Sequence, residues 1–87
     1  MSNAAPTDEA IREAILILAA ARAPKTLCPS EVARDLSLEW RALMPRVRAV
    51  AAQMTEEGML CVTQKGKAVD PHLVRGPIRL SWPAPCG

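Results

Sequence analysis

Apolar residues recur at helical spacing in the middle of the chain, and the strongest such segment covers residues 45–57. The i, i+3, i+4, i+7 positions of one face are taken by Val47, Val50, Ala51 and Met54. Pro45 suits the first helical position, where the N–H that proline lacks would have no helical partner. Gly58 suits the position just past the end, where a left-handed residue closes the last turn. The pattern therefore predicts a helix over residues 45–57.

The segment before Pro45 allows two interpretations. A proline disfavours helical geometry at the preceding residue, so we expect a break at Met44 and a short helical turn over residues 38–43. The alternative is a single kinked helix over residues 38–57. In either case Trp40, Leu43 and Met44 are expected in the core.

Two further helices are predicted in the first half of the chain. The helix over residues 8–22 begins after a capping Thr7 or Asp8. Its buried stripe consists of Ile11, Ala14, Ile15 and Leu18. The helix over residues 29–36 opens with Pro29 in its first turn. Its apolar side consists of Val32, Ala33 and Leu36.

Strand-like patterns dominate the second half. Residues 59–64 and 78–82 read as two antiparallel strands, a tight turn is expected at residues 65–67, and residues 26–28 suit a very short strand. The order helix, short strand, helix, helix, strand, wing, strand predicts an α+β fold, a small winged helix-turn-helix domain with a C-terminal β-hairpin wing. We place this domain at residues 7–82, after a disordered terminus or tag remnant at residues 1–6 and before a tail at residues 83–87.

Charge is distributed unevenly along the chain. The net charge is +2, but residues 1–39 hold four bases and six acids, whereas residues 40–87 hold seven bases and three acids. Such asymmetry points to a polyanionic partner, although a solvated surface can also carry uneven charge. With two Trp and no Phe or Tyr, the core must be built from aliphatic side chains.

In a winged helix, the helix after the turn usually enters the major groove and basic residues of the wing reach phosphates. The small side chains of Ala49 and Ala52 would let that helix approach DNA closely, whereas Glu56 and Glu57 at its end would repel DNA. The double-stranded DNA site is predicted to consist of Arg41, Arg46, Arg48, Gln53, Lys65, Lys67 and Arg75. One alternative is a helix and hairpin that are merely kept soluble by these charges. The other is a winged-helix module that binds another protein instead of DNA, through the first helix or through the alanine-rich face.

No catalytic, metal-binding or cofactor-binding motif stands out, so we expect neither an enzyme nor a cofactor. Cys28 and His72 are the one pair that could act as nucleophile and base, if the fold brought them together. An odd number of cysteines (Cys28, Cys61 and Cys86) without a CxxC pair indicates reduced thiols in the cytoplasm. Neither a signal peptide nor a membrane-spanning stretch is apparent.

Ile17 falls off the buried stripe of the first helix. With Ala21 it would form a small-residue face that suits a homodimer about a two-fold axis. Alternatively, residues 82–85 of the tail cover Ile17, or the face binds another protein.

Five blocks of the sequence occur together in a recognisable order. They are CPSEVAR at residues 28–34, WRALMP at 40–45, VTQKG at 62–66, VDP at 69–71 and RGPIR at 75–79. Over residues 8–82 the chain resembles a family of short bacterial winged-helix-like proteins of unknown function, and its layout is more loosely similar to bacterial transcriptional regulators. The resemblance implies the winged-helix fold, and it supplies no set of DNA-contacting residues.

Overall fold

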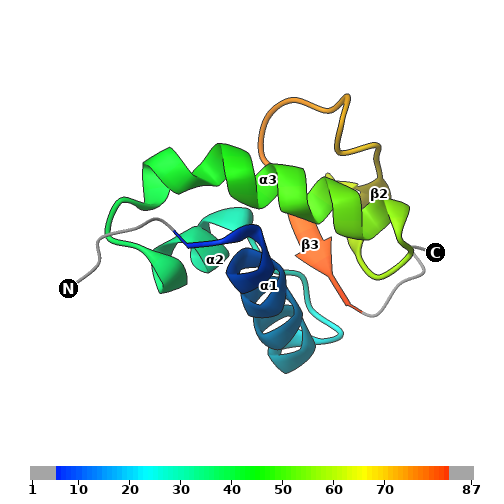
Figure 1. Cartoon of the computed structure of the whole chain (residues 1–87). Coiled ribbons are helices and arrows are strands. Elements are labelled where there is room, and N and C mark those ends of the chain that lie inside the picture. The colour runs from blue at the N-terminus through cyan, green and yellow to red at the C-terminus, as the bar shows by residue number, and fades with distance from the viewer. Residues whose placement is uncertain (1–5, 83–87) are drawn as a thin grey trace.

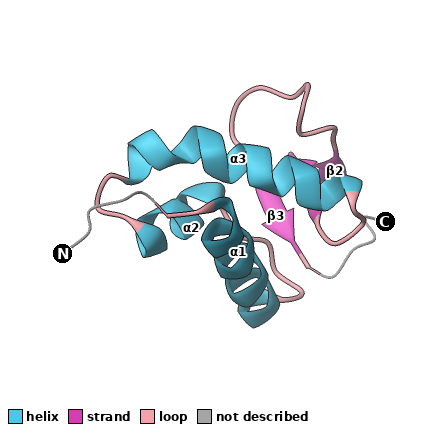
Figure 2. Ribbon diagram, in the orientation of Figure 1, coloured by secondary structure: helices cyan, strands magenta, loops and turns pink. Residues whose placement is uncertain are grey.

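The computed structural model describes residues 6–82 of the chain, and in this range three helices precede a small antiparallel sheet (Figures 1 and 2). The helices are α1 (Asp8–Arg22), α2 (Pro29–Leu36) and α3 (Trp40–Glu56); the strands are β1 (Cys61–Gln64), β2 (Lys67–Ala68) and β3 (Arg79–Ser81). Figure 1 shows α3 running across the molecule, with α1 crossing beside it. The tail expected at residues 83–87 and most of the terminus expected at residues 1–6 lie outside the described residues.

The first two helices begin and end where local signals place them. The Thr7 hydroxyl accepts a hydrogen bond from the Ala10 N–H at 3.1 Å and caps α1. In α2, the Glu31 carboxylate accepts a hydrogen bond from the Cys28 N–H at 2.9 Å, which is one half of a capping box. The predicted bounds of residues 8–22 and 29–36 are therefore confirmed.

The predicted break at Met44 is wrong, and the alternative of a single long helix is closer to the structure. α3 runs for 17 residues from Trp40, with Pro45 inside it. Leu43 and Val47 are both buried on the same face. The continuous burial of this face on both sides of Pro45 outweighs the hydrogen bond that the proline cannot donate.

The sheet has the order β2-β1-β3, and both pairings are antiparallel. The pairing of β1 with β3 confirms the one predicted for residues 59–64 and 78–82, whereas the pairing of β1 with β2 was not predicted. Val62 lies opposite Leu80, and Leu27 pairs with Leu80 in an isolated bridge. The strands are shorter than predicted. The connection between β1 and β3 covers residues 65–78, and we call it the wing. It includes β2 and the loop that rises beside α3 (Figure 1).

The core lies between the three helices and the sheet and is aliphatic. Its largest fully buried side chains are Ile11, Ile15, Leu27, Val32, Val47, Met54, Leu60, Val62, Ile78 and Leu80. Three residues expected in the core, Leu18, Trp40 and Met44, are only half-buried and pack against it. Ala19 is buried without having been predicted to be.

These elements form an α+β fold with the element order and sheet topology of a winged helix. The helix-turn-helix unit consists of α2, a short turn at residues 37–39, and α3. In that turn the Ser37 hydroxyl accepts a hydrogen bond from the Glu39 N–H at 3.0 Å. In residues 6–82, no helix combines the length and apolar character that crossing a bilayer requires.

Candidate nucleic-acid interface

The outward face of α3 is open at its N-terminal half and covered further along. Arg41, Pro45 and Ala49 are exposed on this face. Ala52, expected to lie open on the same face, is only 3% exposed, which corrects that expectation. It lines a hollow together with Thr55, Glu56 and residues 69–72 of the wing. The wing therefore folds against the second half of α3 and leaves the first half free.

Two side chains tie the wing to the rest of the domain. The Arg48 guanidinium donates to the Gly76 carbonyl at 3.0 Å. The Gln64 amide donates to the carbonyls of Arg75 and Pro77 at 2.6 and 3.2 Å. Arg75 is exposed and comes directly before Gly76, so these contacts bring the backbone at Arg75 next to α3.

The tip of the β1–β2 hairpin carries two more cations. Lys65 and Gly66 have φ values of 53° and 81°, the left-handed pair that a two-residue type I′ turn requires. Lys65 and Lys67 are both exposed. Since β1 also carries Gln64, which holds the loop at Arg75, the hairpin tip adjoins that loop. Arg41, Arg48, Arg75, Lys65 and Lys67 thus follow one another along α3 and the wing, and we call these five residues the basic strip.

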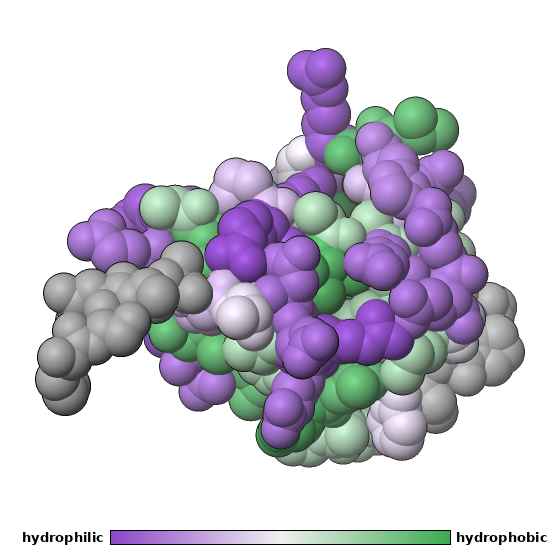
Figure 3. All heavy atoms as spheres, in the orientation of Figure 1, coloured by the Kyte–Doolittle hydropathy of each residue, from purple (hydrophilic) through white to green (hydrophobic). Residues whose placement is uncertain are grey.

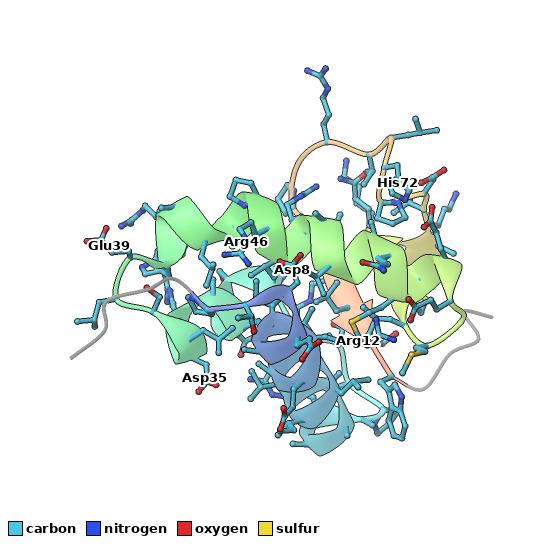
Figure 4. The ribbon with its side chains drawn as sticks, viewed as in Figure 1. Asp8, Arg12, Asp35, Glu39, Arg46 and His72 are labelled. Atoms are coloured by element: carbon cyan, nitrogen blue, oxygen red, sulfur yellow. The ribbon has the colours of Figure 1, made fainter. Side chains whose placement is uncertain are left out.

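Two predicted site residues lie on the other side of α3. The Arg46 guanidinium donates to the Asp8 carboxylate at 2.7 Å, and Figure 4 shows the pair at the start of α1. Gln53 lines a hollow with Asp8, Glu9 and Arg12. The structure therefore separates Arg46 and Gln53 from the basic strip and places them beside the acidic first turn of α1.

Both acids at the end of α3 have basic partners. Glu56 lies 2.9 Å from His72 Nε2, and Figure 4 shows His72 on the wing. Glu57 forms an ion pair with Arg12, and the hydrogen bond from that guanidinium lowers the pKa of the Glu57 carboxyl. The ion pair with Arg12 reduces the repulsion that the Glu57 carboxylate would exert on a polyanion.

An aromatic contact that the sequence did not reveal lies at the other end of α3. The Arg34 and Arg41 guanidinium carbons lie 4.3 and 4.4 Å from the centroid of the Trp40 ring. Arg34 belongs to α2, and its place beside Trp40 depends on how α2 packs against α3. The only sequence signal for this contact is that basic residues and a tryptophan occur close together near residue 40.

The remaining candidate chemistry is dispersed. Cys28 contacts the Ser30 hydroxyl at 3.1 Å, whereas His72 pairs with Glu56, so the fold does not bring Cys28 and His72 together.

Cys28 is a free cysteine, but Cys61 is disulfide-bonded, so the expectation of reduced thiols is wrong at Cys61. Spacing along the chain could not show this, because pairing depends on proximity in space. Cys86 lies outside the described residues. Within residues 6–82 no cluster of three or more His, Cys, Asp or Glu could hold a metal ion.

Hydrophobic surface gathers beside α1. In Figure 3, hydrophilic side chains cover most of the face around α3. Hydrophobic surface lies along the lower edge of the molecule in this view. Ile17 is 59% exposed and borders a groove between α1 and α2. The groove is also lined by Ala10, Glu13, Ala14, Leu18, Asp35 and Leu36. Ala21 is exposed nearby on α1 but does not line the groove. Of the tail residues expected to cover Ile17, only Trp82 is described.

Comparison with known proteins agrees with the resemblance read from the sequence blocks. No curated protein matches the chain. A family described as "Protein of unknown function (DUF3253)" matches residues 8–83, which include α1, the helix-turn-helix unit and the wing. This match covers nearly the whole chain, and the protein belongs to the DUF3253 family.

Proposed function

We propose that the protein is a winged-helix module that binds double-stranded DNA and acts as a transcriptional regulator. The observation that carries this proposal is the basic strip, in which the Arg48–Gly76 hydrogen bond joins the cations of α3 to those of the wing. Five cations along α3 and the adjoining wing suit a polyanion with regularly spaced charges. No catalytic residue, metal or cofactor forms part of the proposal.

The fold supports a specific mode of docking. The free first half of α3 enters the major groove, with small side chains at Ala42 and Ala49 that allow a close approach. Arg48 has guanidinium N–H groups beyond the one bonded to Gly76 and can read a guanine edge. Lys65, Lys67 and Arg75 on the wing neutralise phosphates and fix the orientation on the duplex.

Fluorescence anisotropy with a labelled duplex of generic sequence tests this proposal. The logarithm of the binding constant should fall with the logarithm of salt concentration, with a slope of roughly −4 to −5 if all five cations of the strip neutralise phosphates. Absence of salt-dependent binding at low salt would overturn the proposal.

Two single substitutions locate the surface. Arg75→Gln should weaken binding and make the slope shallower by about 0.9. Arg46→Gln should change binding little, because that guanidinium already pairs with Asp8 on the opposite side of α3. The reverse order of effects would place the DNA on the α1 side.

A second candidate function, protein–protein interaction, is supported by the groove beside Ile17. We propose as its occupant a second copy of the chain, with Ile17 and Ala21 of both copies meeting about a two-fold axis. Sedimentation equilibrium of the parent and of Ile17→Lys tests this pairing. A dimer that becomes monomeric on substitution, with an unchanged circular dichroism spectrum, supports it, and a parent that is monomeric at all concentrations excludes it.

A further inference from the structure

Two positive charges share one aromatic ring at the junction of α2 and α3. Trp40 is the first residue of α3 and packs half-buried against the core. Arg34 reaches it from the last turn of α2 at 4.3 Å, and Arg41 lies 4.4 Å from the same ring centroid. Both distances are within the range of favourable cation–π contact. The two guanidinium carbons can therefore be no farther apart than twice 4.4 Å.

Neither guanidinium has a carboxylate partner among residues 6–82. Arg12, Arg22 and Arg46 each form an ion pair, whereas Arg34 and Arg41 form neither an ion pair nor a hydrogen bond in this part of the chain. Asp35 and Glu39 are close in sequence, but Figure 4 shows their side chains pointing outward at separate edges. The Trp40 ring thus brings two like charges to one site, and neither is paired with a carboxylate of residues 6–82.

We propose that Arg34, Trp40 and Arg41 form a clamp for one phosphate of the DNA backbone. This inference rests on the proposed DNA binding. A phosphodiester would relieve the repulsion between the two cations, and planar guanidinium groups are well shaped to bind its oxygens. The cation–π contacts with the Trp40 ring restrict the positions of both guanidinium groups.

The clamp occupies one end of the basic strip. Arg41 and Arg48 are seven residues apart on the outward side of α3, which corresponds to a rise of about 10 Å. A phosphate held at Arg41 fixes where the open half of α3 sits along the groove. Through Arg34, α2 also contributes directly to DNA contact, which the sequence-based site did not include.

Intrinsic fluorescence can follow the clamp directly. The chain has two tryptophans, so Trp82→Phe leaves Trp40 as the sole emitter. Titration of this variant with a generic duplex should change the Trp40 emission in parallel with the anisotropy of the labelled duplex. Binding without any change in Trp40 emission would overturn the clamp.

Charge substitutions then test whether one phosphate is shared. Arg34→Gln, Arg41→Gln and the double variant should each lower affinity. The double variant should make the salt slope shallower by about 0.9, equivalent to about eightfold weaker binding at 0.1 M salt, and neither single variant should exceed this. Lys25→Gln is the matched control, because it removes an exposed cation from the α1–α2 loop.

The outcomes separate the clamp from the proposed function. A double variant that loses twice this slope indicates two independent contacts, and a double variant indistinguishable from Lys25→Gln indicates none. Either result overturns the clamp and leaves DNA binding in place. A parent chain that fails to bind duplex overturns both proposals.

Discussion

Lys65 combines a strained backbone position with a candidate phosphate contact. Its φ of 53° lies in the left-handed region, where asparagine and glycine are favoured over lysine. A lysine at this position is therefore not explained by the turn, and its exposed cation beside Gly66 is consistent with a role in binding.

Lys65→Asn should separate the two roles. The resulting Asn-Gly pair is the preferred type I′ sequence, so the free energy of unfolding should stay the same or rise. Duplex binding should weaken, with a salt slope shallower by about 0.9, because one phosphate contact is lost. Urea denaturation and anisotropy measure the two effects. A loss of stability would contradict the turn assignment, and unchanged binding would remove Lys65 from the DNA-binding surface.

Glu31 shows how a single residue links a helix start to pH. Its carboxylate accepts the Cys28 N–H and pairs with Arg22. The backbone hydrogen bond, followed by the Arg22 contact, lowers the pKa of Glu31 below its ordinary value. Because the pKa is lower in the folded state, the stabilisation is present above the unfolded-state pKa and is lost as pH falls through the folded-state pKa.

Glu31→Ala should therefore destabilise the protein at neutral pH by about 1 kcal/mol, the usual size of a helix-capping interaction. The difference from the parent should shrink as the pH falls through the lowered pKa, since the parent then loses the same interaction. Chemical denaturation over a range of acidic pH values measures this. A difference that stays constant down to the lowest pH would show that the carboxylate charge is not responsible.

At the scale of elements, α3 is the clearest case of packing overriding a local signal. Pro45 lacks an N–H, so the Arg41 carbonyl has no donor one turn later, and the ring crowds that carbonyl. The helix continues because Leu43, Val47, Val50 and Met54 bury one face along both parts. The side chain of Pro45 itself is exposed and fills no space in the core.

Pro45→Ala should accordingly raise the free energy of unfolding by about 1–3 kcal/mol. It restores the hydrogen bond to Arg41 and removes the steric conflict. Thermal and urea denaturation measure the gain, and the matched substitution Ala49→Gly on the same exposed face should instead lower stability by about 1 kcal/mol. A destabilised Pro45→Ala variant would show that the ring makes a packing contact that outweighs the lost hydrogen bond.

At the scale of the whole molecule, the wing joins the sheet to α3. Gln64 on β1 holds the carbonyls of Arg75 and Pro77, Arg48 holds that of Gly76, and His72 pairs with Glu56. The loop of the wing is thus attached at residue 72 and at residues 75–77. This attachment places Arg75 in the basic strip without any element of regular structure around it.

Gln64→Ala should release this part of the wing without removing a charge. Amide exchange at residues 75–77 should become faster, and duplex affinity should fall between about two- and tenfold, the range expected for a lost hydrogen bond. The salt slope should stay nearly constant, which distinguishes this variant from Arg75→Gln. Faster exchange with unchanged affinity would show that DNA binding does not depend on the position of Arg75.

The sequence by itself determined the elements whose signals are local. Periodicity and the Thr7 cap act over a few residues, so the bounds of α1 and α2 could be predicted. The Lys65-Gly66 turn is equally local, and it joins β1 to β2. The antiparallel pairing of β1 with β3 was predicted from the winged-helix order of the elements, since the wing separates these two strands. The α+β class followed from the same order.

Tertiary structure decided what depends on residues distant in sequence. The passage of α3 through Pro45, the burial of Ala52 under the wing and the disulfide at Cys61 all escaped prediction. Tertiary structure also decided which predicted residues belong to the candidate DNA-binding site. Arg46 forms an ion pair with Asp8 on the other side of α3, and Arg34 contacts the Trp40 ring together with Arg41. A side chain with several rotatable bonds can reach several partners, and packing decides which residues lie within its reach. The local pattern of the sequence does not show which residues those are.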